Sequence, residues 1–88
     1  MDRPGVDLGT LFLSLFSAAC IALGIAPDED GICVVKPDFD RAQHSIEMLE
    51  LLQAKTAGNR SPDEDHLIDR LLYEIRMQYI ALRQNAGP

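Results

Sequence analysis

The stretch SPDEDHLIDRLLYEIRMQYIALRQ, residues Ser61–Gln84, carries the clearest structural signal in the chain. Its start is a capping box, because the Ser61 hydroxyl can accept from the Glu64 backbone while the Glu64 carboxylate accepts from that of Ser61. Pro62 fits the first helical turn. Apolar residues then recur at spacings of four and three, namely Ile68, Leu72, Ile75, Tyr79 and Leu82. The pattern predicts an amphipathic helix from about residue 62 to about residue 84.

A second apolar stripe lies upstream of this helix. It consists of Phe39, Ala42, Ile46, Leu49 and Leu52. Asp38 or Asp40 can cap its start. Gly58 and Asn59 can end it, because both residue types tolerate left-handed backbone. Since the connection to the next helix is short, the two helices are predicted to fold back as an antiparallel hairpin.

The N-terminal segment is apolar, with no charged residue from Leu8 to Pro27. Asp7 or Thr10 can cap a helix here, and Gly24 with Pro27 can end it. Its polar side chains are few, and a helix that is apolar all round is covered on nearly every side by protein or lipid. Three interpretations of this segment therefore compete.

The first interpretation is a membrane span, for which the segment is barely long enough and lacks basic flanking residues. The second is a secretory or lipoprotein signal, because Ser17–Cys20 resembles a lipid-attachment site, although the residues before it are not net positive. The third, which we favour, is a helix covered by the hairpin and by a second copy of the chain. Small chains bury only about 60–65% of their unfolded surface, and association compensates for this.

We expect this self-association to use apolar and small side chains, namely Leu11, Leu15, Ala18, Ala22 and Val34. Residues 32–36 are the only strand-like segment, and they have no partner strand within the chain. They are expected to pair between subunits, to bind a partner strand, or to remain an extended loop. The predicted fold is thus all-α, with three helices in one domain over residues 1–88 and frayed ends at 1–6 and 86–88.

Composition excludes several functions. The chain has 88 residues and a net charge of −6, and an acidic protein repels nucleic-acid backbones. Its two cysteines do not make a disulfide framework. No cofactor is expected, because there is no glycine-rich phosphate loop.

No catalytic or metal site is expected either. His44 and His66 lack the partners that a zinc site needs. The acidic turn at residues 28–31 is not followed by calcium ligands. Cys20 and Cys33 have no base near them in sequence, so we interpret them as free thiols.

Surface recognition is the remaining function. Arginine and tyrosine, which are enriched at binding hot spots, alternate along the C-terminal helix. The candidate partner-binding residues there are Arg70, Tyr73, Arg76, Tyr79 and Arg83. Asp28 and Asp30 form a second candidate, which either receives a basic partner or keeps the protein in solution.

Several local patterns occur in a characteristic order. They are Asp7-x-x-Thr10, Leu13-Ser14-Leu15, the break at Gly24 and Pro27, Lys55-Thr56-Ala57-Gly58-Asn59, Leu71–Arg76 and Tyr79. In this order the chain resembles a family of short bacterial proteins catalogued as a domain of unknown function, number eighteen forty-four. The Lys55–Asn59 segment is the most specific part, and Arg60 follows it where the resemblance leads us to expect a hydrophobic residue.

The resemblance implies an all-helical, cytoplasmic protein without established catalytic residues. A myxobacterial member of similar size resembles a polarity adaptor that joins a response-regulator scaffold to a small Ras-like GTPase in its GTP state. By this resemblance we expect a non-enzymatic adaptor that binds a partner protein. The alternatives are a membrane-associated or lipidated small protein and an enzyme whose site is shared between subunits.

Overall fold

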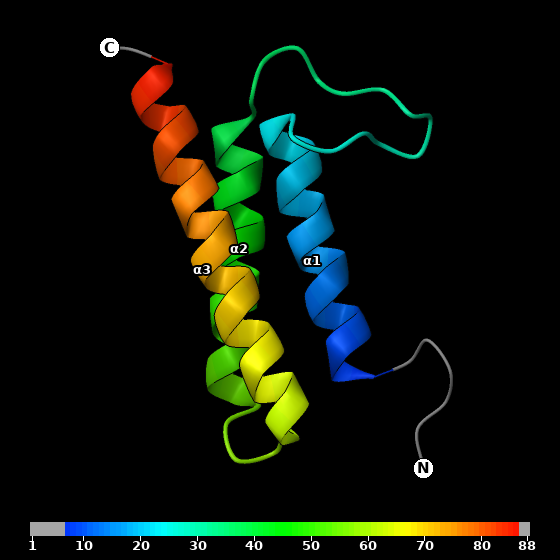
Figure 1. Ribbon diagram of the computed structural model, residues 1–88, viewed down its shortest axis with the longest axis vertical. Coiled ribbons are helices and arrows are strands. Elements are labelled where there is room, and N and C mark those ends of the chain that lie inside the picture. Colours follow the sequence, from blue (N-terminus) through cyan, green and yellow to red (C-terminus); the bar gives the residue numbers. More distant parts are fainter. Residues whose placement is uncertain (1–6, 87–88) are drawn as a thin grey trace.

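The computed structural model describes residues 7–86, which form three α-helices (Figure 1). These are α1 (Leu8–Leu23), α2 (Phe39–Lys55) and α3 (Pro62–Asn85). α1 and α3 run in one direction and α2 runs in the other, so the predicted all-α fold and the α2–α3 hairpin are confirmed. Apart from Ala86, which follows α3, the predicted frayed ends lie outside the described residues.

Side-chain caps fix where α1 and α2 begin. The backbone N–H of Thr10 donates to Asp7 Oδ1 at 2.8 Å, and that of Arg41 donates to Asp38 Oδ1 at 3.1 Å. Asp7 and Asp38 are therefore the caps, and Thr10 and Asp40 are not. The bonds from Thr10 lower the pKa of Asp7, because they stabilise its ionised form.

The capping box at the start of α3 is present in both directions. Glu64 N–H donates to Ser61 Oγ at 3.2 Å, and Ser61 N–H donates to Glu64 Oε1 at 2.8 Å. Pro62 occupies the first turn, as predicted.

One apolar core lies between the three helices. Its buried members are Phe12, Ala19, Cys20, Ala22, Leu23, Ala42, Ile46, Leu49, Ile68, Leu71, Leu72 and Ile75. Every side chain of the apolar stripes predicted for α2 and α3 is buried or half-buried, and Leu71 joins them in the core. α1 contributes five of the twelve, so it packs against both other helices.

A loop joins α1 to α2 across one end of the bundle (Figure 1). α1 ends at Gly24, whose φ of +80° is left-handed, and an added Cβ there would lie 3.0 Å from the Val34 carbonyl oxygen. The Asp38 N–H donates to the Ala22 carbonyl at 2.8 Å, which ties the start of α2 to the end of α1. The two ends of the loop therefore lie close together.

Residues 32–36 form no strand in the part of the chain that the structure describes. They follow the loop, with Val35 fully exposed and Ile32 62% exposed. A strand needs a neighbouring strand for its backbone hydrogen bonds, and this single chain places none there. Of the three alternatives, the chain adopts the extended loop.

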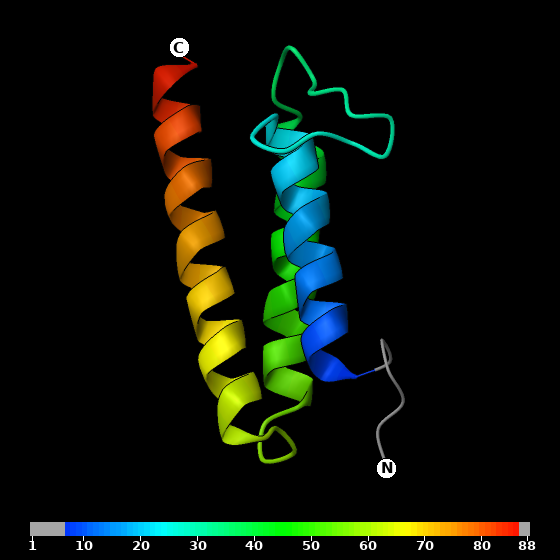
Figure 2. The ribbon, with the colours of Figure 1, turned by 45° about the vertical axis from the view of Figure 1, so that its right-hand side comes forward.

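α1 is covered on one side only. Its opposite side is open, with Leu11 43% and Leu13 49% exposed (Figure 2). Among the described residues, no helix has both the length and the apolar character that a membrane crossing requires.

Candidate protein-interaction surface

Polar pairs hold α3 to α2 along one side of the bundle. Arg76 Nη2 lies 2.6 Å from Glu50 Oε2, and Gln53 Nε2 donates to Asp69 Oδ1 at 2.8 Å. Both members of the ion pair are nearly half exposed, so its contribution to stability is about 0–1 kcal/mol. Arg76, predicted to bind a partner, is thus already paired within the chain.

Two further candidates, Tyr79 and Arg83, pack around Phe39 at the start of α2. The Tyr79 ring meets Phe39 edge-on, with centroids 5.5 Å apart, and its hydroxyl donates to Gln43 Oε1 at 3.3 Å. The Arg83 guanidinium lies 5.1 Å from the centre of the Phe39 ring. The sequence prediction treated these residues as a free surface, whereas here they brace the C-terminal half of α3.

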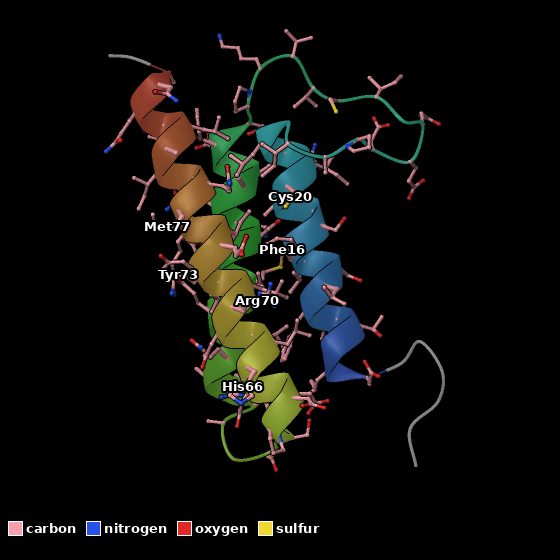
Figure 3. All side chains as sticks on the ribbon, in the orientation of Figure 1. Phe16, Cys20, His66, Arg70, Tyr73 and Met77 are labelled. Atoms are coloured by element: carbon pink, nitrogen blue, oxygen red, sulfur yellow. The ribbon has the colours of Figure 1, made fainter. Side chains whose placement is uncertain are left out.

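The other two candidates on this helix, Arg70 and Tyr73, are exposed on the far side of α3 from the core. We define the α3 outer face by its five exposed residues, His66, Arg70, Tyr73, Met77 and Ile80. Figure 3 labels the first four, from His66 near the start of α3 to Met77 farther along it. Tyr73 is 65% exposed, and Met77 and Ile80 are each 51% exposed.

Sequence reasoning missed Met77 and Ile80, although a signal was present. The five residues are spaced four, three, four and three apart, which makes a second heptad stripe on α3. The first stripe accounts for the core, so the second has no partner within the described chain.

A groove of about 300 Å³ runs beside this face between α2 and α3. Its lining residues are Gln43, Ile46, Glu47, Glu50, Arg76, Tyr79 and Ile80. Ile80 belongs to both the groove and the α3 outer face, so the two form one continuous surface. Apolar side chains beside a hollow are typical of surfaces that bind another protein.

The acidic turn is organised by Asp28. Its Oδ1 accepts from the backbone N–H of Asp30 at 2.9 Å and from that of Ile32 at 3.0 Å. This half-buried carboxylate therefore shapes the loop, and its role in binding a basic partner stays a prediction. Asp30 is exposed and remains a candidate for partner binding.

The residues predicted for self-association are partly exposed and partly buried. Leu11, Ala18 and Val34 are exposed. Leu15 is half-buried against the core, and Ala22 is only 6% exposed within it. Ala22 is a correction, because its side chain lies in the chain's own core, whereas Leu15 stays a prediction.

Arg60 closes the turn between α2 and α3. Its Nη1 donates to the Gln53 carbonyl at 2.6 Å and to Thr56 Oγ1 at 2.9 Å, and its Nε lies 2.6 Å from Asp65 Oδ1. The arginine side chain is 13% exposed. Arg60 thus makes three hydrogen bonds within the chain at a position where a hydrophobic residue was expected. Thr56, in the Lys55–Asn59 segment, accepts one of them.

The two cysteines lie in different environments, and Cys33 is exposed while Cys20 is buried. Burial raises the pKa of the Cys20 thiol, and the Glu74 carboxylate raises it further. A thiol that stays protonated reacts slowly. Among residues 7–86 no group of three side chains could hold a metal ion.

We therefore predict that a thiol reagent labels Cys33 quickly and Cys20 slowly in the folded protein. After unfolding in denaturant, both thiols should react at similar rates. Mass spectrometry of the two peptides measures each rate, and equal labelling of both cysteines in the folded protein would contradict this burial.

Comparison with known proteins identifies the family of this chain. No match emerged from the curated proteins or from the solved structures. The sequence model of a family described as "Domain of unknown function (DUF1844)" matches residues 5–81, which include α1, α2, the Arg60 turn and most of α3. A match over this much of the chain identifies its family, as the order of its local patterns suggested. The protein belongs to the DUF1844 family.

Proposed function

We propose that this protein is a non-enzymatic adaptor that binds a partner protein through the α3 outer face. One observation carries the proposal, namely the exposed heptad stripe with Tyr73, Met77 and Ile80 beside the α2–α3 groove. Apolar side chains that are exposed to water in the free protein lower the free energy of a complex when a partner covers them.

The residue types suit a binding hot spot. Tyrosine and arginine, here Tyr73 and Arg70, are enriched among the side chains that dominate binding energy. Met77 adds a flexible, polarizable side chain that adapts to a partner's shape. The bonds from Arg76, Tyr79 and Arg83 to α2 hold the helix in place before binding, so little order has to be gained on association.

The finer part of the proposal comes from the family resemblance. The partner is a small Ras-like GTPase, a response-regulator-type scaffold is the second partner, and the adaptor acts in the cytoplasm as an oligomer to regulate cell polarity. An adaptor that prefers the GTP state shifts the GTPase towards that state by its difference in affinity for the two. The exposed Asp30 is the candidate contact for the second partner.

The test is a titration of this protein with a small Ras-like GTPase of the same organism, loaded either with a GTP analogue or with GDP. We expect tighter binding to the GTP-analogue form. Tyr73→Ala should weaken that binding about 30-fold, or about 2 kcal/mol, because it removes a hot-spot side chain.

The matched control is Leu51→Ala, which deletes an exposed apolar side chain of α2 that belongs neither to the α3 outer face nor to the groove, and it should leave the affinity unchanged. Circular dichroism of both variants should retain the helical spectrum. Wild-type affinity in both Tyr73→Ala and Arg70→Glu would overturn the α3 outer face as the binding site. If neither the GTP-analogue form nor the GDP form binds, the GTPase is overturned as partner.

A further inference from the structure

We propose that a second copy of this chain binds the open side of α1, with the two α1 helices antiparallel. We define the α1 outer face by the residues that line a shallow hollow there, Thr10, Leu13, Ser14, Ser17, Ala18 and Ile21. The inference rests on the proposed adaptor function in one respect, namely that a dimer would carry two partner-binding faces. It specifies which surface self-associates and in which orientation.

Charge favours this face for self-association. Two copies that each carry a net charge of −6 repel one another wherever their charged surfaces meet. α2 exposes Asp40 and Glu47, so a symmetric contact through these residues brings carboxylates of the two copies together. α1 contains no charged residue at all from Leu8 to Leu23, so two copies can approach there without such contacts.

The length of the open surface also suits a dimer. A standard interface of about 800 Å² per partner is roughly 28 Å across. α1 has 16 residues and is therefore about 24 Å long. Leu11 borders the face, and Ile25 and Val34, which are 44% and 41% exposed, are further exposed apolar side chains beyond the end of the helix.

The position of the acidic turn sets the orientation. Residues 28–30 carry three carboxylates just beyond the C-terminal end of α1. A parallel pair of helices would bring the two turns together, whereas an antiparallel pair separates them by more than the Debye length of about 8 Å. Antiparallel pairing in the register that overlaps the two helices from Leu8 to Leu23 also places Leu13 opposite the partner's Ala18, and Ser14 opposite the partner's Ser17. Large side chains then meet small ones, and the helices can approach closely.

This dimer would leave the binding surface of the adaptor free. The α1 outer face and the α3 outer face lie on different helices, and each consists of side chains outside the buried core. A dimer through α1 therefore presents two copies of the α3 outer face. Two linked sites bind a clustered partner more tightly than one site does.

Light scattering after size exclusion, over a concentration series, tests the association. We expect the mass of a dimer for the wild type. Ser17→Glu and Ser17→Lys should each weaken the dimer at least tenfold, because a charge of either sign would be buried in a dry interface. Ala54→Glu and Ala54→Lys make similar charge changes on an exposed part of α2, and they should leave the dimer intact.

A monomeric wild type at millimolar concentration would overturn the dimer. A monomer that sediments with phosphatidylcholine and phosphatidylglycerol vesicles would also overturn it, and would assign the α1 outer face to lipid. The partner titration keeps the two proposals apart. A monomeric Ser17→Glu variant should still bind through Tyr73, so loss of the dimer and loss of partner binding are separate results.

Cross-linking tests the orientation, in a Cys33→Ser background that removes the exposed thiol. Under catalysed air oxidation, oxygen takes two electrons and two protons from a pair of adjacent thiols to form a disulfide. A mixture of Thr10→Cys and Ile21→Cys proteins should cross-link, because antiparallel pairing places position 10 beside the partner's position 21. Rapid self-linking of Thr10→Cys alone would show parallel helices and overturn the orientation.

Discussion

Replacing Leu49 with alanine should destabilise the protein by about 2–5 kcal/mol, because the change leaves a cavity in the core. Leu49 is fully buried, on the side of α2 that faces the other two helices. A domain of this length has a free energy of unfolding of roughly 4–13 kcal/mol in total. The variant should therefore lose a large part of its stability, as measured by chemical denaturation followed by circular dichroism.

Leu51→Ala is the matched control, because it deletes the same atoms from the same helix. Leu51 is 56% exposed, so its loss should change the free energy of unfolding by only about 0.5 kcal/mol. Similar losses in the two variants would mean that α2 does not turn its Leu49 side inwards. Since self-association also stabilises the folded state, both variants are compared at the same protein concentration.

Removing the Arg60 side chain should have the second large effect. Arg60→Ala deletes three hydrogen bonds, two of them from a single guanidinium nitrogen to the end of α2. Hydrogen bonds to charged groups contribute about 1.5–3 kcal/mol, and half of the Asp65 side chain is in solvent, which reduces its share. We expect a total loss of about 1–3 kcal/mol in chemical denaturation.

Two further variants test whether the hydrogen bonds of Arg60 cause this loss of stability. Arg41→Ala removes an arginine side chain that makes no ion pair among residues 7–86, and it should change stability by about 0.5 kcal/mol or less. Arg60→Leu supplies the hydrophobic residue that the family resemblance leads us to expect at this position. If Arg60→Leu is as stable as the wild type, packing alone closes the turn and the hydrogen bonds add nothing net.

The helices could be predicted because their signals are local. The Ser61 capping box and the stripe from Ile68 to Leu82 depend only on neighbours within a few residues along the chain. The same holds for Gly24, which ends α1 in the left-handed conformation that glycine adopts without strain. Periodicity also indicates which side of each helix is apolar, and the core confirms this for α2 and α3.

The candidate site could be predicted only in part, because it depends on which helix lies beside which. Residue type selected Arg76, Tyr79 and Arg83, yet their neighbours Glu50, Gln43 and Phe39 are 26 to 44 residues away in sequence. Arg60 similarly turned inwards to groups on two helices. Residues 32–36 form no strand within the single chain for the related reason that strand pairing is not local, whereas β-branched composition is.

The hydrogen bond from Asp38 to Ala22 has a consequence for how this family can vary. It joins the two ends of the α1–α2 loop, so the three helices do not depend on exposed loop residues such as Val35. Doubling the length of such a loop raises its closure free energy by only about 0.6 kcal/mol. We therefore expect an insertion beside Val35 to leave the three helices in place.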